Sequence, residues 1–198
     1  MTKRLESKGV SVWGHKKLGG YAGLKHTASK IIDYIPKCKV YCEPLAGLGR
    51  VASLGIDCEE IVLNDKSDYA LKYLRQNFPD DTVRSFDFMK CIELYDDDDT
   101  FFLIDPPWMH EIYNGNSLSF CDRKDKEYYE QIMKVLPNLK ADWILVCGIH
   151  PRYRGSTIMR KSSYNLLRLE SDNKPIFGKK ASVLLASNKP FIKKVKSQ

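Results

Sequence analysis

Long apolar runs are missing from this chain, and no stretch reaches the roughly 18 residues that a membrane span needs. The first nine residues are charged and have no apolar h-region, so we expect no secretory signal. Metal-type spacings are also missing: the six cysteines, at positions 38, 42, 58, 91, 121 and 147, form no CxxC or Cys/His pattern. We therefore expect reduced, mostly buried thiols, no metal site, no membrane partner and a cytoplasmic location.

Internal repeats and low-complexity linkers are absent as well, and 198 residues fit one domain, which we take as 1–198. The net charge of +7 is unevenly spread. Residues 1–30 carry a net +6 and residues 150–198 a net +10, whereas residues 31–149 carry a net −9. Basic segments often contact phosphate, although a solvated Lys-rich surface explains any one of them nearly as well.

The most informative stretch is an apolar run, residues 100–104, that stops at Asp105, Pro106, Pro107 and Trp108. The run is short, β-branched and aromatic, which predicts a buried strand, and the prolines end it. Asp105 then follows the carboxyl end of a strand, where open α/β sheets bind ligands. A carboxylate, a carbonyl fixed by the stiff Pro-Pro backbone and a flat ring suit an exocyclic amine on a planar base. The alternative is a proline turn with Trp108 filling the core.

A glycine-containing turn, Glu43 to Gly49, directly follows a predicted strand at 39–42 and leads into a short helix at 50–54. Such turns let the backbone approach a nucleotide-type ligand. A second predicted strand, 61–65, ends at Asp65, where an acid can bind both hydroxyls of a ribose. The two features together favour a nucleotide-like cofactor more strongly than either alone.

The remaining pattern alternates helices and strands. We expect helices over 27–35, 68–78 and 125–136, and strands over 82–88, 100–104 and 142–148. The third strand, 82–88, ends at Asp87 and Phe88, placed for the amino group and ring of an adenine. A final pair of strands, 162–170 and 180–187, predicts an antiparallel hairpin at a sheet edge. The fold class is therefore α/β, with a mixed, mainly parallel, seven-stranded sheet and a C-terminal antiparallel hairpin.

Four further segments lie before, between or after these elements. Residues 1–18 are a basic arm, and residues 18–25 form a glycine loop that reads either as an anion site or as an ordinary turn before a helix. Residues 109–124 form the longest loop, which is typical of a substrate lid and holds Tyr113 and Phe120 as aromatics that could contact a base. The four acids at 96–99 predict a solvated turn.

Several of these motifs, in this order, resemble the Dam-type DNA adenine-N6 methyltransferases. The matching segments are residues 21–25, the turn at 43–49, Asn64-Asp65, the stretch at 105–108 and the closing strand at 183–188. The resemblance implies a Rossmann-like, S-adenosylmethionine-dependent enzyme that methylates N6 of adenine in DNA without a metal.

Carried over by position, the resemblance implies these roles. The methionine end of the cofactor would be held by Tyr21, Gly23 and Lys25, and wrapped by the turn that contains Glu43, Pro44, Ala46, Gly47 and Gly49. Asp65 would bind the ribose, Asp87 and Phe88 the adenine, and Asp105, Pro106, Pro107 and Trp108 the target amine. Catalysis would rest on positioning and electrostatics, and a target base in a duplex would have to be flipped out.

Three departures from the family pattern bear on recognition. Leu24 replaces a usual glycine, Trp108 replaces the commoner tyrosine, and only sixteen residues separate Phe88 from Asp105, which leaves no room for the usual inserted recognition domain. Selectivity would then come from the loop at 109–124, from the basic tail with Arg152 and Arg154, or from a partner protein, or it would be weak. We expect a monomer or weak dimer.

The alternatives that stay open are an RNA adenine-N6 enzyme, a DNA cytosine-N4 enzyme, and a non-catalytic nucleic-acid-binding subunit that keeps the fold. The same amine-orienting site would serve the first two, since it fixes neither the base nor the sugar. The intact acids at 65, 87 and 105 argue against the third.

Overall fold

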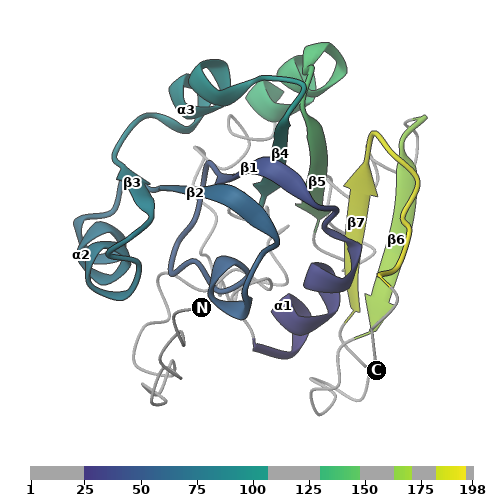
Figure 1. Ribbon diagram of the computed structural model, residues 1–198. Helices are drawn as coiled ribbons and strands as arrows, with labels where there is room; N and C mark the ends of the chain where they lie inside the picture. The colour runs from purple at the N-terminus through teal and green to yellow at the C-terminus, as the bar shows by residue number, and fades with distance from the viewer. Residues whose placement is uncertain (1–24, 107–129, 148–162, 171–181, 195–198) are drawn as a thin grey trace, which may run out of the picture.

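A single seven-stranded sheet forms the centre of the molecule in the computed structural model, which describes residues 25–106, 130–147, 163–170 and 182–194 (Figure 1). Its strand order is β3-β2-β1-β4-β5-β7-β6. The strands are β1 (Cys38–Glu43), β2 (Cys58–Asn64), β3 (Thr82–Arg84), β4 (Thr100–Ile104), β5 (Asp142–Cys147), β6 (Asn165–Glu170) and β7 (Ser182–Ser187). The first five are mutually parallel, β7 is antiparallel to β5, and β6 is antiparallel to β7. The predicted fold class, including the C-terminal hairpin, is confirmed.

Helices cover both faces of this sheet. On one side lie α1 (Lys25–Ile31) and α2 (Asp68–Asn77), and on the other lie α3 (Phe88–Tyr95) and the helical residues 130–135 (Figure 1). Short 3₁₀ turns follow α1 (Ile32–Tyr34), precede β2 (Ala52–Leu54) and precede β5 (Leu136–Asn138). Ser67 caps α2 by accepting a hydrogen bond from the Ala70 N–H, which satisfies a donor that the helix leaves open.

The core lies on both faces of the central strands. All five residues of β4 are buried, and the second halves of β1 and β2 are buried too. Strands that are covered on both faces carry near-continuous apolar runs, which is why these segments are identifiable from sequence. The exposed residues of β1 and β2 lie in their first halves, at the amino edge of the sheet.

The chain changes direction between β1 and β4. From β1 the strand order runs outward through β2 to β3, and on the other side through β4 to β5. In doubly wound sheets this switch point is where the loops after neighbouring strands separate and leave room for a ligand. Glu43 ends β1 and Asp105 follows β4, so two of the predicted site residues flank this point.

Some predicted boundaries are wrong. The third strand ends at Arg84 rather than at residue 88, because Asp87 caps α3 and Phe88 begins it. The turn after β1 contains a 3₁₀ turn at Ala52–Leu54 rather than a helix over 50–54. Pro137 lies inside a 3₁₀ turn that continues from residues 130–135, since proline is tolerated at the first positions of a helical turn.

No helix in the described parts of the chain is long and apolar enough to cross a membrane. Within the same residues no group of three His, Cys, Asp or Glu side chains could hold a metal ion. The five described cysteines are free thiols: Cys42, Cys91 and Cys147 are buried, and Cys38 and Cys58 are half-buried.

Candidate functional site

The carboxyl edge of the parallel strands brings three predicted acids to one side of the molecule. Glu43 ends β1, Asp65 follows β2, and Asp105 follows β4. Since β1 is paired with both β2 and β4, the three acids follow adjacent strands.

Asp105 lies between the ends of the strands on either side of β4. It is half-buried, and the Pro106 that follows it is buried. Its negative charge contributes to raising the pKa of Glu43 at the end of β1, and that of Cys147 at the end of β5. For both groups burial is the larger cause. Asp105 is therefore within electrostatic reach of both neighbouring strand ends.

Glu43 is almost fully buried, at 5% exposure, beneath the turn that follows β1. Its Oε1 accepts hydrogen bonds from the Tyr41 hydroxyl at 2.7 Å and from the Ala52 N–H at 3.1 Å. Burial raises the pKa of Glu43 to about 7, although these two hydrogen bonds stabilise its charged form. In this structure Glu43 anchors the turn, and its contact with a cofactor stays a prediction.

The turn itself depends on two glycines. Gly47 has a φ of 53° and Gly49 a φ of 60°, values that L residues adopt only with strain. A Cβ on Gly49 would lie 3.0 Å from the ring of Phe78, so this glycine also allows the turn to pack closely on the end of α2. The turn is closed by a hydrogen bond from the Gly49 N–H to the Ala46 carbonyl at 2.8 Å.

Asp65 is held against this turn by backbone donors. Its Oδ2 accepts from the Gly47 N–H and its Oδ1 from the Ser67 N–H, both at 2.8 Å. Burial raises the pKa of Asp65, against the opposite effect of these hydrogen bonds. The Lys66 N–H also stabilises the charged form of Asp65. A carboxylate has about four lone-pair positions, so an acceptor position remains for a hydroxyl of a ribose.

Asp87 caps α3 at the neighbouring strand end. Its Oδ1 accepts from the Met89 N–H at 3.1 Å, and its Oδ2 pairs with the Lys66 ammonium at 2.8 Å, which lowers the pKa of Asp87. The expected position of Phe88 beside an adenine ring is not supported, because this side chain is only 3% exposed and packs in the core. Phe86, at 37% exposure, is the aromatic that this loop presents at the surface.

Sequence reasoning missed Asn64, which it treated only as the neighbour of Asp65. The Asn64 side chain is 1% exposed and joins the turn after β1 to the loop after β3. A polar residue at the end of an apolar strand is a weak signal for such a role, because its partners lie about 20 residues away in either direction.

Part of the predicted site lies outside the described residues. This applies to Tyr21 and Gly23 on the cofactor side, to Pro107 and Trp108 beside Asp105, and to Tyr113, Phe120, Arg152 and Arg154 on the substrate side. Lys25 is the first residue of α1.

Comparisons with known proteins give matches at the level of structure. No known family model matches the chain, and no curated protein does. An rRNA methylase from Streptococcus thermophilus aligns with 82% of this chain and 94% of its own, at 11% identity and a TM-score of 0.55. A candidate RNA methyltransferase from Pyrococcus horikoshii aligns with 99% of this chain and 94% of its own, at 16% identity and a TM-score of 0.53. The chain has the Rossmann-like fold of S-adenosylmethionine-dependent methyltransferases.

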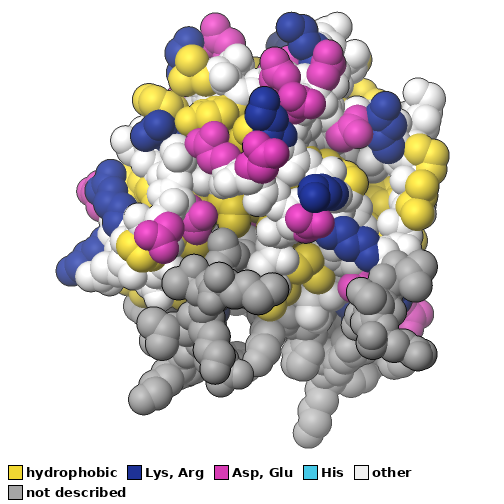
Figure 2. Space-filling model, viewed as in Figure 1, with side chains coloured by type: hydrophobic (Ala, Val, Ile, Leu, Met, Phe, Trp, Pro, Cys, Tyr) yellow, Lys and Arg dark blue, Asp and Glu magenta, His cyan; other side chains and the backbone are white. Residues whose placement is uncertain are grey.

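The described surface of the molecule carries both signs of charge. Figure 2 shows Lys and Arg side chains interleaved with Asp and Glu over the described part of the visible face. Ion pairs among the described residues include Lys39 with Asp99 and Lys66 with Asp87. The described residues in this view therefore present no broad basic face to a phosphate backbone.

Proposed function

We propose that this protein transfers a methyl group from S-adenosylmethionine to an exocyclic amine of a nucleic-acid base, with N6 of adenine in DNA as the first candidate. The observation that carries the proposal is the position of Asp105. This half-buried carboxylate follows the buried strand β4, precedes a buried proline and lies next to the switch point of a methyltransferase-type sheet.

The described residues fit the cofactor. Asp65 has an acceptor position left for a ribose hydroxyl, and the Gly47–Gly49 turn brings the backbone close to it. Asp87 and Phe86 are on the loop after the neighbouring strand, where an adenine would extend. When bound, S-adenosylmethionine supplies an electrophilic methyl group on a sulfonium centre.

The role of the chain is to hold the amine. The Asp105 carboxylate and the Pro106 carbonyl would each accept one hydrogen bond from the two amine N–H groups, which orients the nitrogen lone pair away from both acceptors. Burial of Ile104 and Pro106 excludes water from one side of this position and strengthens the hydrogen bonds. Rate enhancement of this kind comes from positioning rather than from a chemical group of the protein.

An RNA adenine is the second candidate. The two aligned structures are described as an rRNA methylase and a candidate RNA methyltransferase. A cytosine N4 amine would present the same two N–H groups to Asp105 and Pro106.

The deciding experiment is a labelled-methyl transfer assay on the purified protein with duplex DNA, single-stranded DNA and structured RNA, followed by mass identification of the modified nucleoside. We expect N6-methyladenine from DNA. Label in RNA alone would select the second candidate, and N4-methylcytosine would change the base. Binding of S-adenosylhomocysteine with no transfer to any of the three would support a non-catalytic nucleic-acid-binding subunit.

A further inference from the structure

The end of β2 carries a buried amide that joins the two loops on either side of it. The Asn64 Nδ2 donates to the Pro44 carbonyl at 2.8 Å and to the Phe86 carbonyl at 3.1 Å, and the Asn64 Oδ1 accepts from the Phe86 N–H at 2.7 Å. The Asn64 backbone carbonyl also accepts from the Ala46 N–H at 2.8 Å.

The hydrogen bonds of the Asn64 side chain continue the contact between neighbouring strands where the ladders of β2 with β1 and with β3 end. On one side β1 gives way to Pro44, which has no N–H to continue the ladder. On the other side β3 ends at Arg84, which is the register partner of Asn64. Beyond the end of β3, the Asn64 amide forms two hydrogen bonds with the Phe86 backbone, as a residue of a neighbouring strand would. An amide is the side chain that offers two donors and an acceptor on one planar group.

We propose that Asn64 is a positioning residue for the cofactor: its amide fixes the distance between the turn at 44–49 and the loop at 85–87 before any ligand binds. This inference rests on the proposed function. The turn carries Gly47, which holds Asp65, and the loop carries Phe86 and Asp87. When the two sides of a site are already fixed, less of the binding free energy is lost in ordering them.

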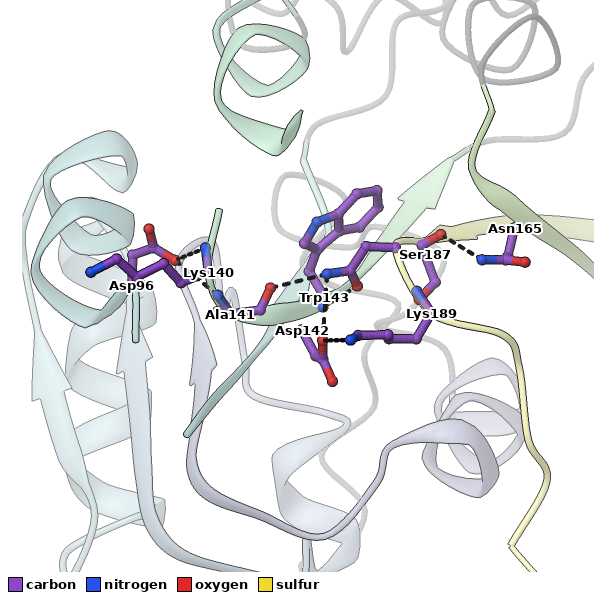
Figure 3. A network of polar contacts seen from close by, with 9 residues as sticks. Asp96, Lys140, Ala141, Asp142, Trp143, Asn165, Ser187 and Lys189 are labelled. Carbon is purple, nitrogen blue, oxygen red and sulfur yellow. Dashed lines mark hydrogen bonds and ion pairs between the residues drawn. The ribbon is translucent and has the colours of Figure 1, made fainter. Parts of the chain in front are cut away.

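The chain offers a matched control at the opposite end of the sheet. Asn188 has the same kind of three-point contact: its Oδ1 accepts from the Trp143 N–H at 3.0 Å, and its Nδ2 donates to the Ala141 carbonyl at 3.2 Å and to Asp142 at 3.5 Å. Figure 3 shows the surrounding network at the start of β5, which includes Ser187 and Lys189. Loss of this amide would destabilise the fold far from the proposed cofactor.

The experiment measures S-adenosylhomocysteine binding by calorimetry and urea unfolding for the wild type, Asn64→Ala and Asn188→Ala. We expect Asn64→Ala to weaken binding by about tenfold to a hundredfold, as loss of positioning does. Asn188→Ala should keep the wild-type Kd within about twofold despite a lower unfolding midpoint, since its contacts are remote from the cofactor. Once the nucleic acid that accepts the methyl group is identified, steady-state kinetics gives a second test. Asn64→Ala should raise KM for S-adenosylmethionine far more than it lowers kcat.

Equal binding by Asn64→Ala and the wild type, or an equal loss in both variants, would overturn the role of Asn64 and leave the proposed function intact. Failure of the wild type to bind S-adenosylhomocysteine would instead overturn the proposed function. If Asn64→Ala does not fold, amide hydrogen exchange in the wild type decides. The Phe86 N–H should be protected without ligand, and exchange at the rate of an open loop would contradict the proposal.

Discussion

Each acidic side chain at the carboxyl edge of the sheet has different partners, and these decide what the acid can do. Glu43 is buried and accepts from Tyr41 and Ala52, so it stabilises the turn. Asp65 accepts from backbone N–H groups, among them those of Gly47 and Ser67, and keeps an acceptor position for a ligand. Asp105 follows the central strand β4, where the charge of its carboxylate reaches both neighbouring strand ends. Of the three, Asp105 is the one that we propose for the target amine.

Asp105→Asn should reduce methyl transfer by about a hundredfold or more, because an amide is a weaker acceptor for the amine N–H at the moment charge develops on it. S-adenosylhomocysteine binding should stay close to that of the wild type. The measurement is labelled-methyl transfer at saturating cofactor, with Kd by calorimetry. Asp99→Asn, at the other end of β4 in an exposed ion pair with Lys39, is the control. Undiminished transfer by Asp105→Asn would remove Asp105 from the site.

The raised pKa of Glu43 predicts that the free energy of unfolding depends on pH. Its folded-state pKa of about 7 lies above the ordinary value of 4.5, so between these values the folded protein binds more protons than the unfolded chain. The free energy of unfolding should therefore fall as the pH rises from about 4.5 to about 7, by about 3 kcal/mol at most. Urea unfolding across this range measures it.

Two variants test the assignment to Glu43. Glu43→Gln removes the titrating group and should flatten this part of the pH profile. Tyr41→Phe removes a hydrogen bond that stabilises the charged carboxylate, so it should move the fall in stability to higher pH. A pH profile that Glu43→Gln leaves unchanged would show that another group is responsible.

At the scale of elements, the turn after β1 packs closely against the end of α2. Gly49 packs against Phe78 and Leu74, whereas Gly55, which also has a positive φ, has nothing within 4 Å of the position of a Cβ. The two glycines thus share the backbone requirement and differ in packing. Comparing substitutions at Gly49 and Gly55 therefore separates the cost of a positive φ from the cost of a close contact with Phe78.

Gly49→Ala should lower the free energy of unfolding by more than Gly55→Ala does. Both substitutions place an L residue at positive φ, at a cost of about 1 kcal/mol, and only the first adds an overpacked contact worth about 1–3 kcal/mol. Urea midpoints give the difference. S-adenosylhomocysteine binding should fall for Gly49→Ala alone. Equal midpoints would mean that Phe78 moves aside freely.

At the scale of the whole molecule, charge is divided along the chain. Residues 150–198 carry twelve Lys or Arg and two Asp or Glu, whereas residues 31–149 are net acidic. In the described part, the basic Lys189 and Lys193 pair with Asp142 and Asp33. Neutralised side chains contribute little to long-range attraction, so nucleic-acid affinity would depend on the remaining basic residues.

Replacing both Arg152 and Arg154 by Ala should weaken binding to nucleic acids of every sequence. Each lost phosphate contact should reduce the slope of log K against log salt by roughly 0.9 for duplex DNA. Fluorescence titrations between low and moderate salt measure this slope. Lys37→Ala and Lys39→Ala, at the amino end of β1 and paired with Asp57 and Asp99, are the controls and should leave it unchanged. A slope that keeps its wild-type value in the double variant would place the binding face elsewhere.

Local pattern by itself determined the buried strands and the glycine turn after β1. The apolar runs before Asp65 and Asp105 mark buried strands, and the glycines at 47 and 49 mark a turn that needs positive φ; these are properties of a few consecutive residues. The whole of α3 was missed, because whether Phe88 continues a strand or begins a helix depends on the cap at Asp87 and on packing in the core.

Only the tertiary structure decided which residues meet. The pairing of β1 with β4 places Asp105 beside Glu43, although the two residues are 62 positions apart in the chain. The ladders of β2 with β1 and with β3 end near Asn64, and its amide therefore finds partners on two loops. Such contacts follow from sheet order and register, which are fixed by long-range packing of the strands, and no local period in the sequence encodes them.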